Sequence, residues 1–296
     1  MTDLNEPFII KAPKRIQDSK KYYKWLGTLQ NQIINTFHST IDIDFAESIF
    51  SHAVFTSFFG ALVMVGNHYG KTVRIRYNGQ SAVGQYFNKS GLVGYFQKAA
   101  GTNIMSEYPY SIDFSPIDVT DESIMEYIDG IIGLFPLNLS NSAKSALFSS
   151  LYEICNNSAE HSNSICGTYG CGHWMPTQKK LFFSLYDTGV GIPSLVKYHV
   201  DPSMDSLSAL KWALTEGNST RQMEGNTPRG LGLTNLLRFI SISGNSLTIL
   251  SNDLYFHYKG NDYEYDYLDS PIIGTFISMS IKEDPNHYYA YGQKED

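Results

Sequence analysis

The chain has 296 residues, of which 42% are hydrophobic, enough for a packed core and for two domains of about 150 residues each. Its formal net charge of −7 disfavours a nucleic-acid partner, because phosphate backbones are bound by clusters of Lys and Arg. Three cysteines, an odd number, fit a reducing compartment in which they remain thiols. We therefore expect a globular protein of the cytoplasm.

No export signal or membrane span is predicted. The N-terminal residues carry charges where a signal peptide needs an apolar stretch. The longest apolar run, Ala53 to Gly66, has about 14 residues, fewer than the about 20 that cross a membrane. This length is typical of a buried helix, and we expect no membrane partner.

The first region, residues 1–116, alternates strand and helix signals. Residues 39–45 alternate apolar and polar side chains as a strand does, and the apolar run that follows predicts a helix. Residues 71–78 predict the next strand, and residues 90–101 a second amphipathic helix. This order predicts a small α/β domain. We interpret the Pro-, Ser- and Asp-rich residues 106–123 as the junction to a second domain, residues 117–296.

The second region opens with helix signals at residues 119–135 and from residue 140 onward. The second of these helices contains the stretch EICNNSAEH, residues 153–161. At intervals of three and four it carries apolar residues on one side and polar residues on another. A solvated face is the ordinary explanation of such a polar stripe, and a ligand site is the alternative. The apolar stripe is Leu147, Leu151, Ile154 and Ser158, and the polar stripe is Glu153, Asn157, Glu160 and His161.

A predicted strand ends at Asp187 and is followed by Gly189 and Gly191. Glycines at the end of a strand let the backbone approach a ligand closely. A dinucleotide-binding fingerprint is the alternative, but Ser194 replaces its third glycine and the following residues do not predict a helix. A carboxylate at this place suits an exocyclic amine, because it accepts hydrogen bonds from amino groups.

Further along, Gly230 and Gly232 open a predicted helix. Backbone N–H groups at the start of a helix can hold phosphates, helped by the helix dipole. The long polar stretch between Ser194 and Arg229 is a candidate for a mobile lid. A tyrosine-rich hairpin near residues 258–267 and a strand from Gly274 complete the predicted elements.

Four motifs resemble those of a known family. EICNNSAEH resembles the N-box, DTGVG the first glycine box, RGLGL the second and GTF the last box of the GHKL ATPases, the group that includes gyrase and the histidine kinases. Their order matches that family from about residue 120 to residue 282. The resemblance implies an α/β (α+β sandwich) architecture called the Bergerat fold, in which helices cover one face of a mixed sheet and hold ATP against it.

The resemblance also implies roles for single residues. Asn157 would ligate Mg²⁺, Asp187 would bind the adenine amino group with Thr275 beside it, and Glu153 would be the general base. Mg²⁺ takes amide or carboxylate oxygens together with phosphates, and a carboxylate one helical turn away can deprotonate a water. The implied cofactor-binding set is completed by Gly189, Gly191, Arg229, Gly230, Leu231, Gly232 and Leu233.

Residues 41–97 resemble a STAS domain, the fold of anti-sigma-factor antagonists, in their strand, apolar helix and second strand. The Asp-Ser pair that carries the phosphorylated serine of those antagonists is not evident, and FSHAVFTS stands in its place. Ser51, Thr56 and Ser57 are candidate phosphate acceptors there. The alternative is that they are buried helix residues.

A zinc site is a further alternative, because His161, Cys166, Cys171 and His173 follow one another closely. Zinc sites favour short knuckles such as C-x2-C, and this spacing matches no such pattern. A loop of small residues with buried thiols is the other interpretation.

We expect a Mg²⁺-dependent ATP-binding protein that hydrolyses ATP or uses it as a conformational switch to regulate a protein partner. A homodimer is compatible with this expectation. A protein serine/threonine kinase of the anti-sigma type is the alternative, and a nucleotide-binding module without turnover is another. Gyrase has an Asp where Glu160 lies, which favours hydrolysis, and no preceding helix offers a phospho-accepting histidine for autokinase activity.

Overall fold

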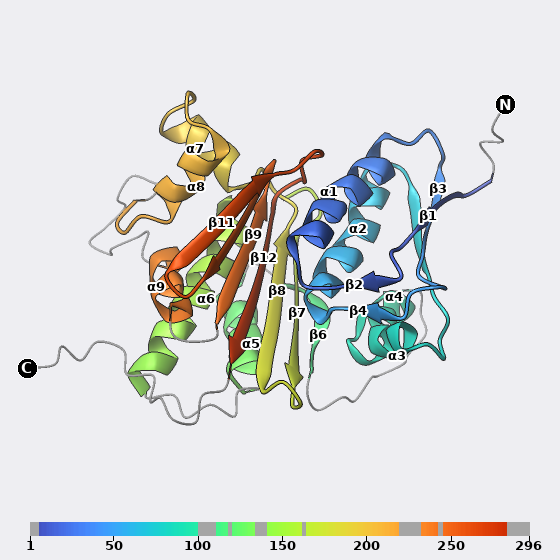
Figure 1. Ribbon diagram of the computed structural model, residues 1–296, viewed down its shortest axis with the longest axis horizontal. Coiled ribbons are helices and arrows are strands. Elements are labelled where there is room, and N and C mark those ends of the chain that lie inside the picture. Colours follow the sequence, from blue (N-terminus) through green and yellow to red (C-terminus); the bar gives the residue numbers. More distant parts are fainter. Residues whose placement is uncertain are drawn as a thin grey trace, which may run out of the picture.

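The computed structural model describes residues 6–99, 111–117, 120–133, 141–161, 164–218, 232–241 and 245–282. Its N-terminal part contains a parallel sheet with strand order β1-β3-β5 and a short parallel pair, β2 and β4. Two helices, α1 and α2, lie between this sheet and the rest of the molecule (Figure 1). The elements of this part are β1 (Phe8–Lys11), β2 (Arg15–Ile16), α1 (Lys20–Asn35), β3 (Thr40–Asp44), β4 (Phe50–Ser51), the 3-10 helix η1 (Ala53–Phe55), α2 (Thr56–His68), β5 (Thr72–Arg76), α3 (Ala82–Lys89) and α4 (Leu92–Ala99).

The rest of the molecule is built on a seven-stranded sheet with strand order β11-β10-β9-β12-β8-β7-β6. The helices α5, α6 and α9 cover the face that is turned away from α1 and α2 (Figure 1). The elements of this part are β6 (Ser111–Ile117), α5 (Asp121–Gly133), α6 (Asn141–His161), β7 (Thr168–Met175), β8 (Lys180–Asp187), α7 (Ile192–His199), α8 (Ser206–Ala213), α9 (Gly232–Ile240), β9 (Ser246–Ser251), β10 (Leu254–Lys259), β11 (Asp262–Tyr267) and β12 (Thr275–Lys282).

Most of the elements expected from the sequence are confirmed. The strand, apolar helix and strand of the first region are β3, α2 and β5, and the later helix is α4. The two helices of the second region are α5 and α6, and the tyrosine-rich hairpin is β10 with β11. The organisation is therefore α/β, as expected.

Two expectations about the sheets are wrong. The large sheet is not mixed: every pair of neighbouring strands in it is antiparallel. Three of these pairs, β7-β8, β9-β10 and β10-β11, are joined by short turns, which antiparallel strands permit. The supposed junction at residues 106–123 contains β6, which pairs with β7 at the edge of this sheet. The boundary between residues 116 and 117 falls inside that strand.

Both faces of the central strands of the large sheet are buried, and this joins the two parts of the chain. On one face, Leu181, Phe183 and Leu185 of β8 pack in a core with α5, α6 and α9. On the other face, Phe182 and Tyr186 of the same strand pack in a second core with α1 and α2. The alternation follows from the two-residue period of a strand. The N-terminal part is thus packed directly onto the sheet rather than tethered to it.

Candidate functional site

Asp187, the last residue of β8, carries a buried carboxyl group that is 6% exposed. Its Oδ1 accepts a hydrogen bond of 2.8 Å from the N–H of Gly189. Within the described part of the chain this is the one hydrogen bond that the carboxyl group receives. Burial raises the pKa of Asp187 to about 7, and the Gly189 hydrogen bond opposes that rise only in part. When it is charged, the carboxylate therefore has fewer hydrogen-bond donors than it could accept from.

Two hydroxyl groups lie on the strands next to Asp187. Thr275 is its register partner on β12, and Ser251 of β9 is in turn the partner of Thr275. The two hydroxyl oxygens are 2.8 Å apart, and Ser251 Oγ also accepts a hydrogen bond of 2.9 Å from the N–H of Ile192. Three adjacent strands thus end in a row of polar side chains at the edge of the glycine loop, residues 189–191.

The glycine loop depends on Gly191, whose φ of 84° lies in the left-handed region. A Cβ at this position would come within 2.6 Å of the Asn252 side chain. Asn252 Nδ2 donates to the carbonyl of Val190 at 2.9 Å, and its Oδ1 accepts from the N–H of Ser194 at 3.1 Å. Glycine is therefore required both by the backbone conformation and by the close approach of Asn252.

Contrary to the sequence-based expectation, a helix, α7, follows Gly191 at once. Its N-cap is a glycine and offers no side-chain acceptor, so the first turn uses acceptors from distant strands instead. Ser251 and Asn252 supply them. Pro193 suits the first turn because it has no backbone N–H that would need an acceptor. The sequence of residues 192–199 alone does not indicate these acceptors, because Ser251 and Asn252 lie 59 and 58 positions away in the chain.

The helix α7 and its neighbour α8 also bear on the proposed lid between Ser194 and Arg229. Leu210 of α8 is buried in the core with α5, α6 and α9. The first half of that stretch is thus packed helix. Residues 219–231, with Arg229, Gly230 and Leu231 of the second glycine box, lie outside the described residues.

The N-box helix α6 has the two sides expected of it. Leu147 and Ile154 are buried, whereas Glu153 is half-buried and Asn157 is exposed. Glu153 takes part in an interaction with its surroundings. The side chains of residues 158–161 lie outside the described set, so the rest of the polar stripe stays a prediction.

The remaining predicted residues lie on α9. Gly232 is the first residue of that helix, and Leu233 is partly buried against the core that α6 also lines. The two helices pack against each other. The structure thus brings Asp187, Gly189, Gly191 and Thr275 together, and it makes α6 a neighbour of α9, which begins at Gly232.

The zinc alternative gains no ligand cluster. Cys171 and His173 are buried on β7, and burial lowers the pKa of His173 to about 4, with the nearby His52 contributing. Cys166 donates its S–H to the carbonyl of Met64 at 3.4 Å. The residues described by the structure contain no group of three or more His, Cys, Asp or Glu side chains able to hold a metal ion.

The candidate phosphate acceptors of the first region are buried. Thr56 and Ser57 are 1% and 0% exposed, and Ser51 is 9% exposed. Ser57 Oγ is hydrogen-bonded at 2.8 Å to Ser184 Oγ on β8. The interpretation as buried helix residues is therefore confirmed for Thr56 and Ser57, while Ser51 lies on β4 rather than in a helix.

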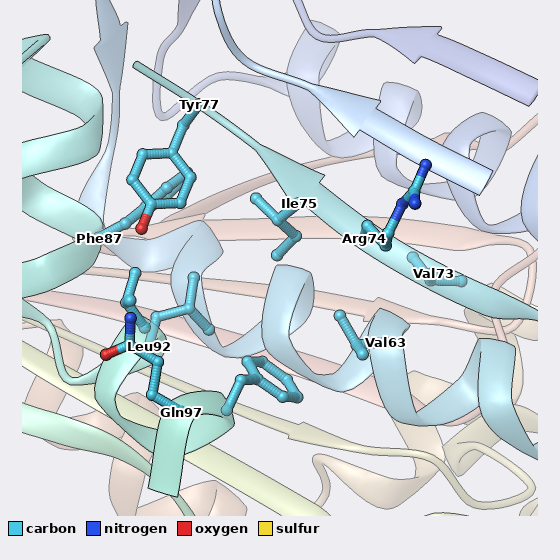
Figure 2. Close-up of a pocket in the computed structure, with 10 residues that line it drawn as sticks. Val63, Val73, Arg74, Ile75, Tyr77, Phe87, Leu92 and Gln97 are labelled. Carbon is cyan, nitrogen blue, oxygen red and sulfur yellow. The ribbon is translucent and has the colours of Figure 1, made fainter. Parts of the chain in front are cut away.

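A cavity of about 300 Å³ lies apart from these residues, between α2, β5, α3 and α4 (Figure 2). Its wall is mainly apolar, and the Tyr77 ring and the Gln97 side chain are among the groups that line it (Figure 2). The guanidinium of Arg74 points away from it and binds Asp42 through two hydrogen bonds of 2.6 and 3.0 Å. None of the predicted site residues lines this cavity.

Comparison with models of known protein families finds no match, and comparison with curated proteins finds none either. Within the described ranges, no helix combines the length and the apolar character needed to cross a membrane.

Proposed function

We propose that the protein binds ATP together with Mg²⁺ in the manner of the GHKL ATPases, and hydrolyses it or uses it as a switch to regulate a protein partner in the cytoplasm. One observation carries the proposal: a buried carboxyl group, Asp187, ends a central strand beside the hydroxyl of Thr275 and directly before a glycine loop. A homodimer remains compatible with this proposal.

The Asp187 carboxyl group fits an adenine amino group chemically. A buried carboxylate is costly unless donors surround it, and the backbone N–H of Gly189 alone does not return the pKa of Asp187 to its ordinary value. An exocyclic amine would supply the missing donor. The Asp187 carboxylate would also discriminate adenine from guanine, because guanine carries a carbonyl oxygen where adenine carries the amine.

The glycine loop supports the same proposal. The missing side chain of Gly191 leaves room for Asn252, which fixes the loop from the outside through Val190 and Ser194. A binding loop held rigidly costs less entropy on binding than one that must be ordered. We therefore assign Gly189 and Gly191 to the wall of the base pocket.

Asn157 would hold the Mg²⁺ ion through its amide oxygen. Mg²⁺ needs only one or two protein ligands when phosphates supply others, so a single exposed amide is a sufficient contribution from the protein. The metal would neutralise charge on the phosphates. Glu153, one helical turn before Asn157 on α6, would accept a proton from the attacking water.

The fold proposed here is a Bergerat-type domain packed onto a STAS-like N-terminal part. The placement of α5, α6 and α9 on one face of a seven-stranded sheet supports the first assignment. Three parallel strands with helices between them support the second. The antiparallel pairing throughout the large sheet is a departure from the mixed sheet of the family.

Hydrolysis or switching is preferred over phosphorylation of the protein's own first region. Thr56 and Ser57 are almost fully buried, so neither hydroxyl can reach a phosphate donor without unfolding. A kinase acting on another protein remains the alternative function.

The test is incubation of the full chain with γ-labelled ATP and Mg²⁺, followed by separation of free phosphate from labelled protein. Release of free phosphate supports hydrolysis. Label on a candidate partner protein would select the kinase instead, and binding with neither product would select a regulatory module. The proposal of ATP binding is overturned when equilibrium dialysis with Mg²⁺ shows no retention of ATP.

A further inference from the structure

A closed ring of three hydrogen bonds joins α1 to the large sheet. Gln30 of α1, 1% exposed, donates from Nε2 to the hydroxyl of Tyr186 at 2.6 Å. That hydroxyl donates to the carbonyl oxygen of Ile273 at 2.8 Å, and the N–H of Ile273 donates to Gln30 Oε1 at 2.7 Å. Each group in the ring therefore donates one hydrogen bond and accepts one.

The ring lies directly behind the candidate base pocket. Tyr186 immediately precedes Asp187 on β8, and Ile273 precedes Gly274 and Thr275 at the start of β12. The two strands are register partners at Asp187 and Thr275. Gln30 thus contacts the Ile273 backbone before Thr275 and the side chain of Tyr186, the residue before Asp187.

The spacing of these two strand ends leaves little freedom. Gly274 has a φ of 77°, and a Cβ there would come within 2.0 Å of the backbone oxygen of Asp187. A small shift of Ile273 would therefore move Gly274 against the residue that carries the carboxyl group. The position of Asp187 depends on that of Ile273, and the position of Ile273 depends on Gln30.

The helix that carries Gln30 is itself anchored to the sheet. Tyr23 of α1 is hydrogen-bonded through its hydroxyl to Ser278 Oγ of β12 at 2.6 Å. Its ring packs against Phe276 and Tyr255, with centroids 6.2 and 5.6 Å away. A displacement of α1 would therefore reach β12 as well as the ring of hydrogen bonds.

We propose that Gln30 is a positioning residue through which the N-terminal part sets the affinity of the site for the adenine base. The inference rests on the proposed function and adds a regulatory role to it. Any partner or modification that moves α1 changes the distance between the Asp187 and Thr275 strand ends. By linkage, nucleotide binding stabilises the docked position of α1 to the same extent.

The test compares Gln30→Met with the matched substitution Gln32→Met, since Gln32 is an exposed residue of the same helix. Methionine keeps the length of the side chain but removes the acceptor of the Ile273 N–H and the donor to the Tyr186 hydroxyl, which still donates to the Ile273 carbonyl. Affinities are measured by calorimetry for Mg-ATP and for Mg-tripolyphosphate, which lacks the base. Gln30→Met is expected to lower the affinity for ATP about tenfold, within the range of coupling between two sites, and to leave tripolyphosphate binding and the Gln32→Met protein unchanged.

A milder variant, Tyr186→Phe, keeps the proposal falsifiable if Gln30→Met does not fold, because it deletes one hydroxyl from the ring and keeps the aromatic packing. It should also lower the ATP affinity, and in the double variant the two losses should be less than additive because both act through one ring. Equal losses for ATP and tripolyphosphate would show a merely structural role, and an unchanged ATP affinity in both variants would overturn the proposal. A wild-type chain that binds tripolyphosphate but no ATP, or neither, refutes the proposed function instead.

Discussion

Asp187 and Thr275 are direct partners in the antiparallel pairing of β8 with β12, and both side chains are buried, at 6% and 3% exposure. The pairing places a carboxyl group and a hydroxyl group side by side at one end of the sheet, directly before the glycine loop. Buried polar groups are retained at a cost in stability. A row of them beside a glycine loop indicates a role in recognition.

The first prediction concerns the identity of the base. Asp187→Asn keeps the shape of the side chain but replaces one acceptor oxygen with a donor that faces the adenine amino group. The affinity for ATP should fall by about tenfold to a hundredfold, because the amine then meets a donor, and tripolyphosphate should bind as before. Asp129→Asn on the exposed side of α5 is the control. If the affinities for ATP and GTP fall equally in Asp187→Asn, the residue does not recognise the base.

The second prediction concerns pH. Burial raises the pKa of Asp187 to about 7, so the carboxyl group of the free protein is neutral below that pH and charged above it. An amine donor favours the charged form, and binding therefore releases a proton. The ratio of ATP affinity to GTP affinity should rise as the pH increases through about 7 and then level off. The ratio removes the titration of the phosphates, which both nucleotides share.

The same pKa predicts how the stability of the nucleotide-free protein depends on pH. The folded state holds the Asp187 proton to a higher pH than the unfolded state does, because the pKa is raised from 3.8 to about 7. The contribution of this group to stability is therefore full at low pH and declines as the pH rises between those two values. Asp187→Asn should remove this part of the pH dependence in thermal unfolding. A profile identical to that of the wild type would contradict the burial of the carboxyl group.

The third prediction concerns the glycine loop. Gly191→Ala combines an unfavourable φ with a Cβ that meets Asn252, whereas Gly70→Ala has a similar φ of 68° and open space around it. Gly191→Ala should lose more stability than Gly70→Ala in denaturant unfolding, because the φ of 84° and ψ of 149° at Gly191 are essentially restricted to glycine and the Asn252 contact adds to the strain. Adding Asn252→Ala to Gly191→Ala should recover part of the difference. Equal losses in the two glycine variants would show that the Asn252 contact is unimportant.

These contacts illustrate what the sequence could and could not predict. Asp187 was identified from a local motif, because it ends an apolar strand directly before two glycines, whereas Thr275 was identified only from the resemblance of GTF to the last box of the GHKL family. Gln30 and Asn252 were not, because their partners lie 156 and 62 positions away in the chain. No local pattern marks a glutamine in an amphipathic helix as a buried one. The strand β6 was missed because its pairing with β7 defines it rather than a strand pattern of its own. The helix α1 was also not predicted, although its buried residues Tyr23, Leu26, Leu29 and Ile33 recur with helical spacing.

The fourth prediction concerns the metal. Asn157→Ala removes an amide oxygen from an exposed position of α6, so the fold should remain intact while Mg²⁺-dependent ATP binding falls at least tenfold. Asn156→Ala is the matched control, because this neighbouring asparagine lies about 100° around the helix. Calorimetry with and without Mg²⁺ separates the two contributions. Undiminished ATP affinity in the presence of Mg²⁺ would contradict the N-box assignment.

The fifth prediction separates hydrolysis from binding. Glu153 lies one helical turn before Asn157 on α6 and is half-buried, so Glu153→Gln keeps its size and hydrogen-bonding reach and removes only the proton acceptor. ATP binding should survive, whereas turnover should fall by about a hundredfold or more, the range that general-base catalysis supplies. The matched control is Glu126→Gln on the exposed side of α5. Turnover is measured as phosphate formation in a single-turnover experiment, in which product release does not limit the observed rate.

The outcome of this experiment also decides between the functional classes. Accumulation of the ATP-bound form of Glu153→Gln, with no phosphate released, would support the hydrolase, because the ATP-bound state then lasts longer than in the wild type. Wild-type turnover in Glu153→Gln would show that another group accepts the proton. A wild-type protein that binds ATP without turnover would leave Glu153 no proton to accept, and Glu153→Gln would then change neither affinity nor product. In that case the bound nucleotide acts through the position of the strand ends at Asp187 and Thr275, and the Gln30 variants become the informative ones.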